Sequence, residues 1–188
     1  MKYKEIIEGC KRGDKELQAR LVQVFAPTLM SICLRYANGD RSVAKDALQE
    51  TFINVFKYMN SYKGKGSFEG WLKRIAVNCS ISFHKKVRPI HFADQSELDG
   101  TNNAVIPDIY SRLAKEDILA LIQELPQSFR LVFQLNVIEG YNHREIGEML
   151  DITPSTSRAT LSRARAKLIE LLQQQANTTT RLLSQPLL

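Results

Sequence analysis

The sequence has few of the features that mark metal sites, disulfide frameworks or membrane proteins. Its three cysteines and three histidines are scattered rather than set in close pairs, as a zinc site requires. An odd number of cysteines is most simply explained by reduced thiols in a cytoplasmic protein. The N-terminal segment MKYKEIIEGCKRGDKE lacks the apolar core of a signal peptide, and no run approaches the roughly 18 apolar residues of a membrane span. We therefore expect no metal and a cytoplasmic location.

A catalytic constellation is also missing. No nucleophile has a neighbouring base, and Gly64 and Gly66 do not form the GxxxxGK[ST] phosphate loop. We therefore expect no enzymatic activity, no cofactor and no small-molecule substrate. Basic residues, in contrast, are abundant: 26 Lys and Arg against 20 Asp and Glu give a net charge of +6. This balance favours a polyanionic partner, although charge alone would suit a membrane surface equally well.

Nearly every segment has the apolar spacing of an amphipathic helix, and almost none alternates as a strand does. The expected helices cover residues 3–11, 14–25, 27–36, 42–58, 68–86, 111–125 and 126–138, followed by two more near the C-terminus. Prolines and turn-forming residues interrupt this pattern between the two groups of helices. The sequence thus predicts an all-α fold with two small helical domains joined by a flexible linker. The expected boundaries are 1–88, a linker at 89–110, 111–175, and a fraying tail at 176–188.

The segment NHREIGEMLDITPSTSRATLSRARAK predicts a helix, a tight turn and a second helix rich in arginine. Asn142 and Glu145 have the spacing of a capping box, and Asp151 stands in the turn, where left-handed backbone is needed. Thr153 followed by Pro154 is typical of a helix start. Two short helices of this kind are suited to placing the second in a DNA major groove. The alternative is that the arginines form only a solvated helix face.

Three segments of the chain, in order, resemble one family. SVAKDALQETFINVF is similar to the second conserved region of bacterial sigma factors, and SFEGWLKRIAVN resembles the promoter-melting region that follows it. LPQSFRLVFQLNVIEGYNHREIGEML resembles the fourth region. The spacing suits the extracytoplasmic-function (ECF) group of the sigma-70 family, which keeps only the second and fourth domains. The resemblance covers nearly the whole chain except the linker and the tail.

The resemblance implies a factor that binds core RNA polymerase and directs promoter-specific transcription initiation. The helix over residues 42–58 would dock on the polymerase. Four of its residues lie at offsets of three, four and seven on one face: Asp46, Gln49, Glu50 and Ile53. The residues alone would favour a solvated acidic face, and the resemblance assigns the face to polymerase binding.

The resemblance assigns residues 61–88 to recognition and opening of the −10 element. The basic and amide side chains expected to contact DNA there are Lys63, Lys65, Lys73, Arg74, Asn78, Lys85, Lys86 and Arg88. Phe68 and Trp71 could stack on an extruded base, but their helical spacing favours a place in the core. Ser82 stands where aspartate is usual in the family, which leaves the details of −10 recognition open.

The second helix of the C-terminal pair would read the −35 element. Candidates for base and near-base contacts are Ser155, Thr156, Ser157, Arg158 and Thr160. Candidates for phosphate contacts are Arg144, Arg163 and Arg165. The implied partners are core RNA polymerase, promoter DNA in duplex and single-stranded form, and an anti-sigma factor.

Two other functions compete with this reading. A helix-turn-helix regulator that binds an operator would use only the C-terminal motif, and would leave residues 42–78 unexplained. A sigma-mimicking decoy would bind a regulatory protein and no DNA, and the basic helices argue against it.

Overall fold

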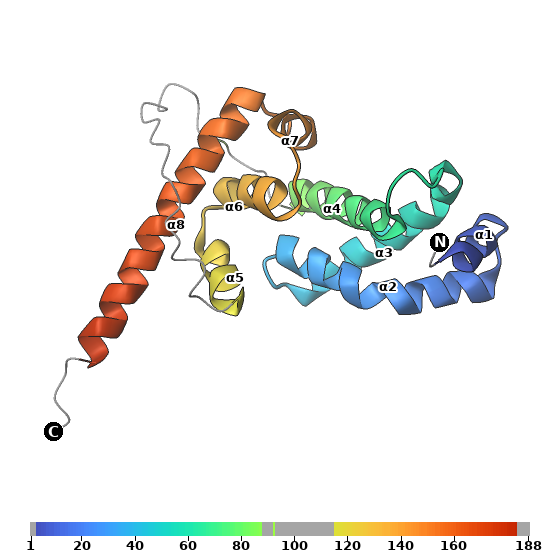
Figure 1. The fold of residues 1–188 in the computed structure, drawn as a ribbon, viewed down its shortest axis with the longest axis horizontal. Helices are drawn as coiled ribbons and strands as arrows, with labels where there is room; N and C mark the ends of the chain where they lie inside the picture. Colours follow the sequence, from blue (N-terminus) through green and yellow to red (C-terminus); the bar gives the residue numbers. More distant parts are fainter. Residues whose placement is uncertain (1–2, 88–91, 93–114, 184–188) are drawn as a thin grey trace. The chain divides into compact units, whose positions relative to one another are not determined.

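The computed structural model describes residues 3–87, residue 92 and residues 115–183. Every regular element in this part of the chain is a helix (Figure 1). The α-helices are α1 (Lys4–Lys11), α2 (Lys15–Tyr36), α3 (Arg41–Lys57), α4 (Phe68–Val87), α5 (Lys115–Glu124), α6 (Gln127–Phe133), α7 (His143–Leu150) and α8 (Pro154–Leu183). Short 3₁₀ and π turns cover Met59–Ser61 and Gln134–Ile138.

The chain divides into two compact units, residues 1–89 and residues 90–188. This division and the all-helical composition confirm the predicted fold class. Apart from residue 92, the expected linker lies outside the described residues.

The N-terminal unit is organised around α2, which packs against α1, α3 and α4. The Asp14 carboxylate caps α2 by accepting hydrogen bonds from the backbone amides of Glu16 and Leu17. Helices α1 and α2 approach so closely that a Cβ on Gly9 would lie 2.1 Å from Leu17 Cδ1. A side chain at position 9 would therefore force the Leu17 side chain to move.

Helix α2 corrects the expectation of two helices meeting at Pro27. Pro27 lies exposed inside one continuous helix, although proline lacks the amide for one helical hydrogen bond. Residues on both sides of it, Phe25 and Leu29 among them, are buried on the same stripe, and this packing keeps the helix intact. By length and composition α2 is also apolar enough to cross a membrane. This is weak evidence for a membrane span, because the buried side of α2 packs against α1, α3 and α4.

Helices α3 and α4 complete the N-terminal core. The Asp40 carboxylate caps α3, and Ala44, Ala47, Phe52 and Val55 are buried along its inner face. On α4 the buried positions include Phe68, Leu72 and Ala76. The three cysteines of the unit, Cys10, Cys33 and Cys79, are free and buried, and burial raises the pKa of each thiol above its usual 9.0.

The C-terminal unit packs α5, α6 and α7 against the long helix α8. The buried stripe of α8 consists largely of Leu161, Ala164, Leu168 and Leu172. The helix continues to Leu183, through most of the segment expected to fray, and residues 184–188 lie outside the described part. The π turn at Gln134–Ile138 replaces the regular helix expected there.

Candidate functional site

Helices α7 and α8 form the predicted helix-turn-helix. The Asn142 side chain accepts hydrogen bonds from the backbone amides of Arg144 and Glu145, and the Glu145 carboxylate accepts from the Asn142 amide, each at 3.0 Å. This reciprocal pair confirms the predicted capping box. Asp151 ends α7 in the left-handed region, with φ 61° and ψ 48°.

The turn also requires a small residue that the sequence analysis missed. A Cβ on Gly147 would lie 2.6 Å from the backbone carbonyl oxygen of Ile152. The start of α8 follows at once: the Thr153 hydroxyl accepts a hydrogen bond from the Thr156 amide at 3.0 Å, and Pro154 is the first helical residue. Because Gly147 has no side chain, the backbone at Ile152 can pass close to α7 before the second helix begins.

One side-chain hydrogen bond links the two helices of the motif. His143 Nδ1 and the Ser157 hydroxyl are 2.9 Å apart. Burial lowers the pKa of His143 below its usual 6.5, and the nearby Arg158 and Arg165 lower it further. A neutral imidazole at this position adds no charge to the arginine-rich surface.

The residues expected to contact bases divide into two groups on α8. Ser155 and Arg158 are exposed, and Thr156 is half-buried. Ser157 is fully buried and Thr160 is 7% exposed. Both lie on the inward face of α8 with Leu161 and Ala164, so their side chains are directed into the unit. We therefore leave Ser157 and Thr160 out of the base-contacting set.

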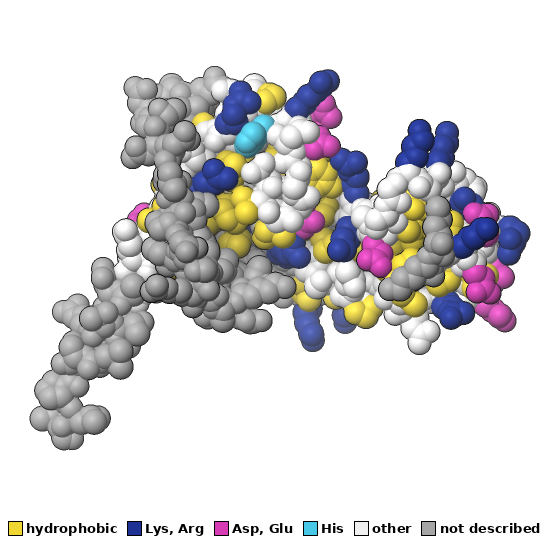
Figure 2. Space-filling view, in the orientation of Figure 1, with side chains coloured by type: hydrophobic (Ala, Val, Ile, Leu, Met, Phe, Trp, Pro, Cys, Tyr) yellow, Lys and Arg dark blue, Asp and Glu magenta, His cyan; other side chains and the backbone are white. Residues whose placement is uncertain are grey.

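The expected phosphate contacts lie around this helix. Arg144 is exposed and forms an ion pair with Glu148 (Nε–Oε1, 3.4 Å), whereas Arg163 and Arg165 are half-buried. Figure 2 shows dark blue Lys and Arg side chains gathered near the cyan histidine of this unit. The line of Ser155 and Arg158 continues through the half-buried Ser162, which the sequence analysis did not select.

In the N-terminal unit, α3 presents the four residues expected to bind polymerase. Asp46, Gln49, Glu50 and Ile53 are all exposed, and we call them the docking face. Ile53 is 59% exposed, so it presents an apolar side chain that a partner could cover. The arrangement can offer carboxylates to a basic surface together with one apolar contact.

A glycine-containing loop, residues 62–67, connects the 3₁₀ turn to α4. The buried Tyr62 closes it by donating a hydrogen bond from its hydroxyl to the Gly66 carbonyl oxygen at 2.9 Å. Lys63 and Lys65 are exposed, and Gly64 and Gly66 have φ values of 74° and 87°. The left-handed glycines let both lysines project from a tight loop.

A cluster of aromatic side chains, Tyr62, Phe68 and Trp71, packs beneath the backbone of this loop. Phe68 is 5% exposed, and its ring centroid lies 5.1 Å from that of Tyr62 and 5.7 Å from that of Trp71. The expectation that Phe68 belongs to the core is confirmed. Trp71 is half-buried in the same cluster.

The outer face of α4 carries most of the remaining DNA candidates. Arg74, Asn78, Ser82 and Lys85 are exposed at successive helical turns, and Lys73 is exposed beside them. The first four make up what we call the α4 stripe. It unites a cation, an amide, a hydroxyl and a second cation on one line. The Lys86 side chain and Arg88 lie outside the described residues.

A groove of about 370 Å³ separates the docking face from the α4 stripe, and its lining includes Glu50, Asn78 and Ser82. Asn54 lies in it and donates hydrogen bonds to Glu50 Oε1 at 3.1 Å and to Cys79 Sγ at 3.3 Å. Sequence reasoning did not identify Asn54, although it follows Glu50 by one helical turn. Within the described residues no group of three or more His, Cys, Asp or Glu could hold a metal ion.

Comparison with known proteins links both units to one family. Residues 21–89 match the family model for sigma-70 region 2, and residues 115–168 match the model for sigma-70 region 4. The ECF RNA polymerase sigma factor SigW of Bacillus subtilis is 29% identical over 89% of this chain and 95% of that protein. SigE of Mycolicibacterium smegmatis, another ECF RNA polymerase sigma factor, is 33% identical over 85% of this chain and 63% of that protein.

A solved structure has the same fold. The sigma factor RpoE of Bartonella quintana, crystallised with the anti-sigma factor NepR, has a TM-score of 0.51 and 20% identity, covering 82% of this chain and 96% of that one. The fold, the two matched regions in order and the relatives along most of the sequence agree. The chain belongs to the ECF group of the sigma-70 family.

Proposed function

We propose that this protein binds core RNA polymerase through the docking face of α3 and directs it to a set of promoters. The loop at residues 62–67 and the α4 stripe bind and open the −10 element, while α8 reads the −35 element from the major groove. The observation that carries the proposal is the pairing on one small unit of an acidic–apolar face on α3 with a basic face on α4. The first suits a protein partner and the second suits DNA.

In this function the protein performs no bond chemistry. Strand opening is driven by the free energy of binding single-stranded DNA, and the polymerase makes RNA. The protein acts in the cytoplasm without a cofactor, and an anti-sigma factor holds it inactive, as in many members of the family.

The −35 contacts follow from exposure and helix geometry. Arg158 and Ser155 are exposed in the N-terminal half of α8, the part of a recognition helix that reaches base edges. Thr156 adds a near-base contact, and Arg144, Arg163 and Arg165 bind phosphate. Ser157 positions the helix through His143 and does not contact DNA.

Dependence on polymerase tests this function against an operator-binding regulator. The full chain and core polymerase, separately and together, are titrated onto a promoter fragment identified by transcript mapping. A sigma factor gives specific binding and strand opening only with core present. Tight, specific binding of the chain alone as a dimer, unchanged by core, would favour the operator-binding function instead.

A further inference from the structure

Helix α1 and the loop at residues 62–67 enclose a groove that has no role in the proposed function. Its volume is about 400 Å³, and we call it the α1 groove; its lining residues are Lys4, Ile7, Glu8, Lys11, Tyr62, Lys63 and Gly64. Ile7 and Tyr62 are buried, at 4% and 6% exposure, and provide an apolar floor. The groove thus combines an apolar base with charged side chains from two separate elements.

Three lysines and one glutamate set the charge of the α1 groove. Lys4 and Lys63 are exposed, and Lys11 forms an ion pair with Glu8 at 3.2 Å. Exposed ion pairs of this kind contribute little stability, so an incoming anion can take Lys11 from Glu8 at small cost. The surplus of two positive charges favours an anionic partner.

The α1 groove continues along the loop. A second hollow of about 300 Å³ shares Ile7 and Tyr62 with it and reaches Gly66 and Ser67. Gly64, with φ 74°, has no side chain to obstruct the passage. The lysines lie along the α1 groove, whereas the second hollow is aromatic and has the Glu69 carboxylate at its edge. An apolar and aromatic floor with cationic edges, as in the α1 groove, is the kind of surface that follows a nucleic-acid single strand.

We propose that the α1 groove binds the phosphate backbone of single-stranded promoter DNA, with Lys4 and Lys11 acting together with Lys63. The inference rests on the proposed function and extends it, because it adds α1 to the surface that holds the opened strand. A single strand fits better than a duplex, whose convex surface would touch the lysine ends and leave the floor uncovered.

The test uses holoenzyme assembled from core polymerase and the full chain, bound to a promoter fragment with a pre-opened −10 region. Binding is measured over a range of salt concentrations for the wild type and for Lys4→Ala/Lys11→Ala. Each phosphate contact on single-stranded DNA contributes about −0.7 to the slope of log K against log salt. The double variant should therefore make this slope less steep by about 1.4 and weaken binding evenly across base sequences.

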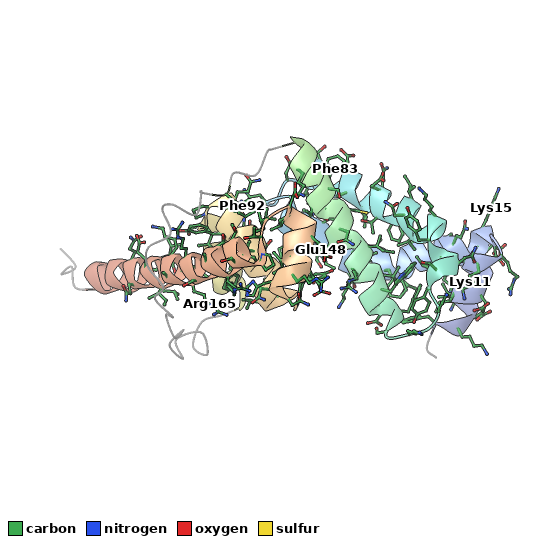
Figure 3. All side chains as sticks on the ribbon, turned by 90° about the horizontal axis from the view of Figure 1, so that it is seen from above. Lys11, Lys15, Phe83, Phe92, Glu148 and Arg165 are labelled. Carbon is green, nitrogen blue, oxygen red and sulfur yellow. The ribbon has the colours of Figure 1, made fainter. Side chains whose placement is uncertain are left out.

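Two matched variants control for charge and folding. Lys15→Ala removes an exposed lysine at the same end of the unit but outside the α1 groove, and should leave the slope unchanged (Figure 3). Lys4→Arg/Lys11→Arg keeps both charges and should retain the wild-type slope. Thermal unfolding checks that each variant is folded.

Neutral methylphosphonate links, introduced one at a time into the opened strand, locate the contact. The wild type should lose affinity at one or two positions at which the double alanine variant loses none. An unchanged slope, or the same losses in both proteins, overturns the inference while the proposed function stands. So does a loss of core affinity in the double variant, because it would place these lysines against an acidic protein surface. If wild-type holoenzyme forms no promoter complex, the proposed function fails and this inference fails with it.

Discussion

At the scale of single residues, two arginines of α8 are expected to contribute to DNA binding in different ways. Arg158 is exposed on the line that begins with Ser155, whereas Arg163 is half-buried on another side of the helix. If Arg158 reads a base, Arg158→Ala should cost about 1–3 kcal/mol and relax selectivity at one position of the −35 element. Holoenzyme binding to fragments with all four bases at each position measures this.

Arg163→Ala is the matched control for that measurement. It should weaken binding by a similar amount for every sequence, since phosphate contacts carry no base information. A uniform loss in Arg158→Ala as well would make Arg158 a phosphate contact.

The histidine between the helices gives a pH-dependent prediction. Burial and the two nearby arginines hold the pKa of His143 below 6.5 in the folded protein. As pH falls through 6.5, the unfolded chain takes up a proton before the folded one does, so the free energy of unfolding decreases in that range. An NMR titration of the His143 ring should give a pKa below 6.5, and the decrease in stability should be smaller in His143→Gln. A ring pKa at or above 6.5 would contradict this account.

Ser157 and Thr160 show where residue-level prediction from the sequence stops. Both are small and polar, so apolar periodicity does not mark them as inward-facing. Their spacing from Leu161 and Ala164 is nevertheless helical, and it places them on the buried stripe of α8. Ser157 can be buried because His143 satisfies its hydroxyl, a contact between residues 14 positions apart that sequence spacing does not reveal.

At the scale of elements, substitutions in the docking face of α3 should change polymerase affinity without changing the stability of the fold. Asp46 and Glu50 are exposed and cap no helix, and the one printed side-chain contact of Glu50 is the exposed hydrogen bond that it accepts from Asn54. Reversing both to lysine should weaken core binding by about 2 kcal/mol or more, roughly 30-fold, because like charges would face a basic partner surface. Fluorescence titration with core polymerase measures the affinity, and thermal unfolding should be nearly unchanged.

A matched reversal of charge outside α3 completes that experiment. Glu5→Lys/Glu16→Lys changes two exposed carboxylates on α1 and α2 by the same amount. It should leave core affinity near the wild-type value. Equal losses in the two double variants would mean that only the net charge matters and that α3 carries no specific contact.

The turn between α7 and α8 can be tested with a pair of glycine substitutions. Gly147→Ala should destabilise the C-terminal unit by about 1–3 kcal/mol and weaken −35 binding, because the new Cβ would meet the Ile152 carbonyl oxygen at 2.6 Å. In Gly70→Ala, where the new Cβ has only ordinary contacts with Ser67, stability should rise by about 0.5–1 kcal/mol. Denaturant unfolding compares the two, and tolerance of Gly147→Ala would show that the turn relaxes.

Helix positions could be predicted well, and so could helix starts that carry a local capping signal, but other helix ends could not. The capping box at Asn142 and the Thr153–Pro154 start are local signals, and the structure confirms both. The helix end predicted at Pro27 was wrong, because the burial of residues on both sides of Pro27 outweighs one missing hydrogen bond. Beyond Gln175 the sequence lost its apolar periodicity, yet α8 continues, since polar residues can extend a helix that is already nucleated.

At the scale of the whole molecule, function depends on several contacts made by one chain. If the docking face, the loop at residues 62–67, the α4 stripe and α8 bind as we propose, each needs to bind only moderately, because attachment at one site raises the effective concentration at the others. On that proposal, a recognition helix with few exposed side chains in its N-terminal half can still direct a specific complex. The resemblance supplied these roles, since neither periodicity nor composition identifies the polymerase as the partner of an acidic helix face.

Transcription with purified components tests whether the chain directs promoter-specific initiation. Core polymerase and the full chain are incubated with fragmented genomic DNA, and the 5′ ends of the RNA products are sequenced. The account predicts a limited set of start sites, absent without the chain, preceded by two shared sequence blocks at a fixed separation. Arg158→Ala should change the preference within the upstream block only. If no start site in a genomic promoter library depends on the chain, the account is contradicted.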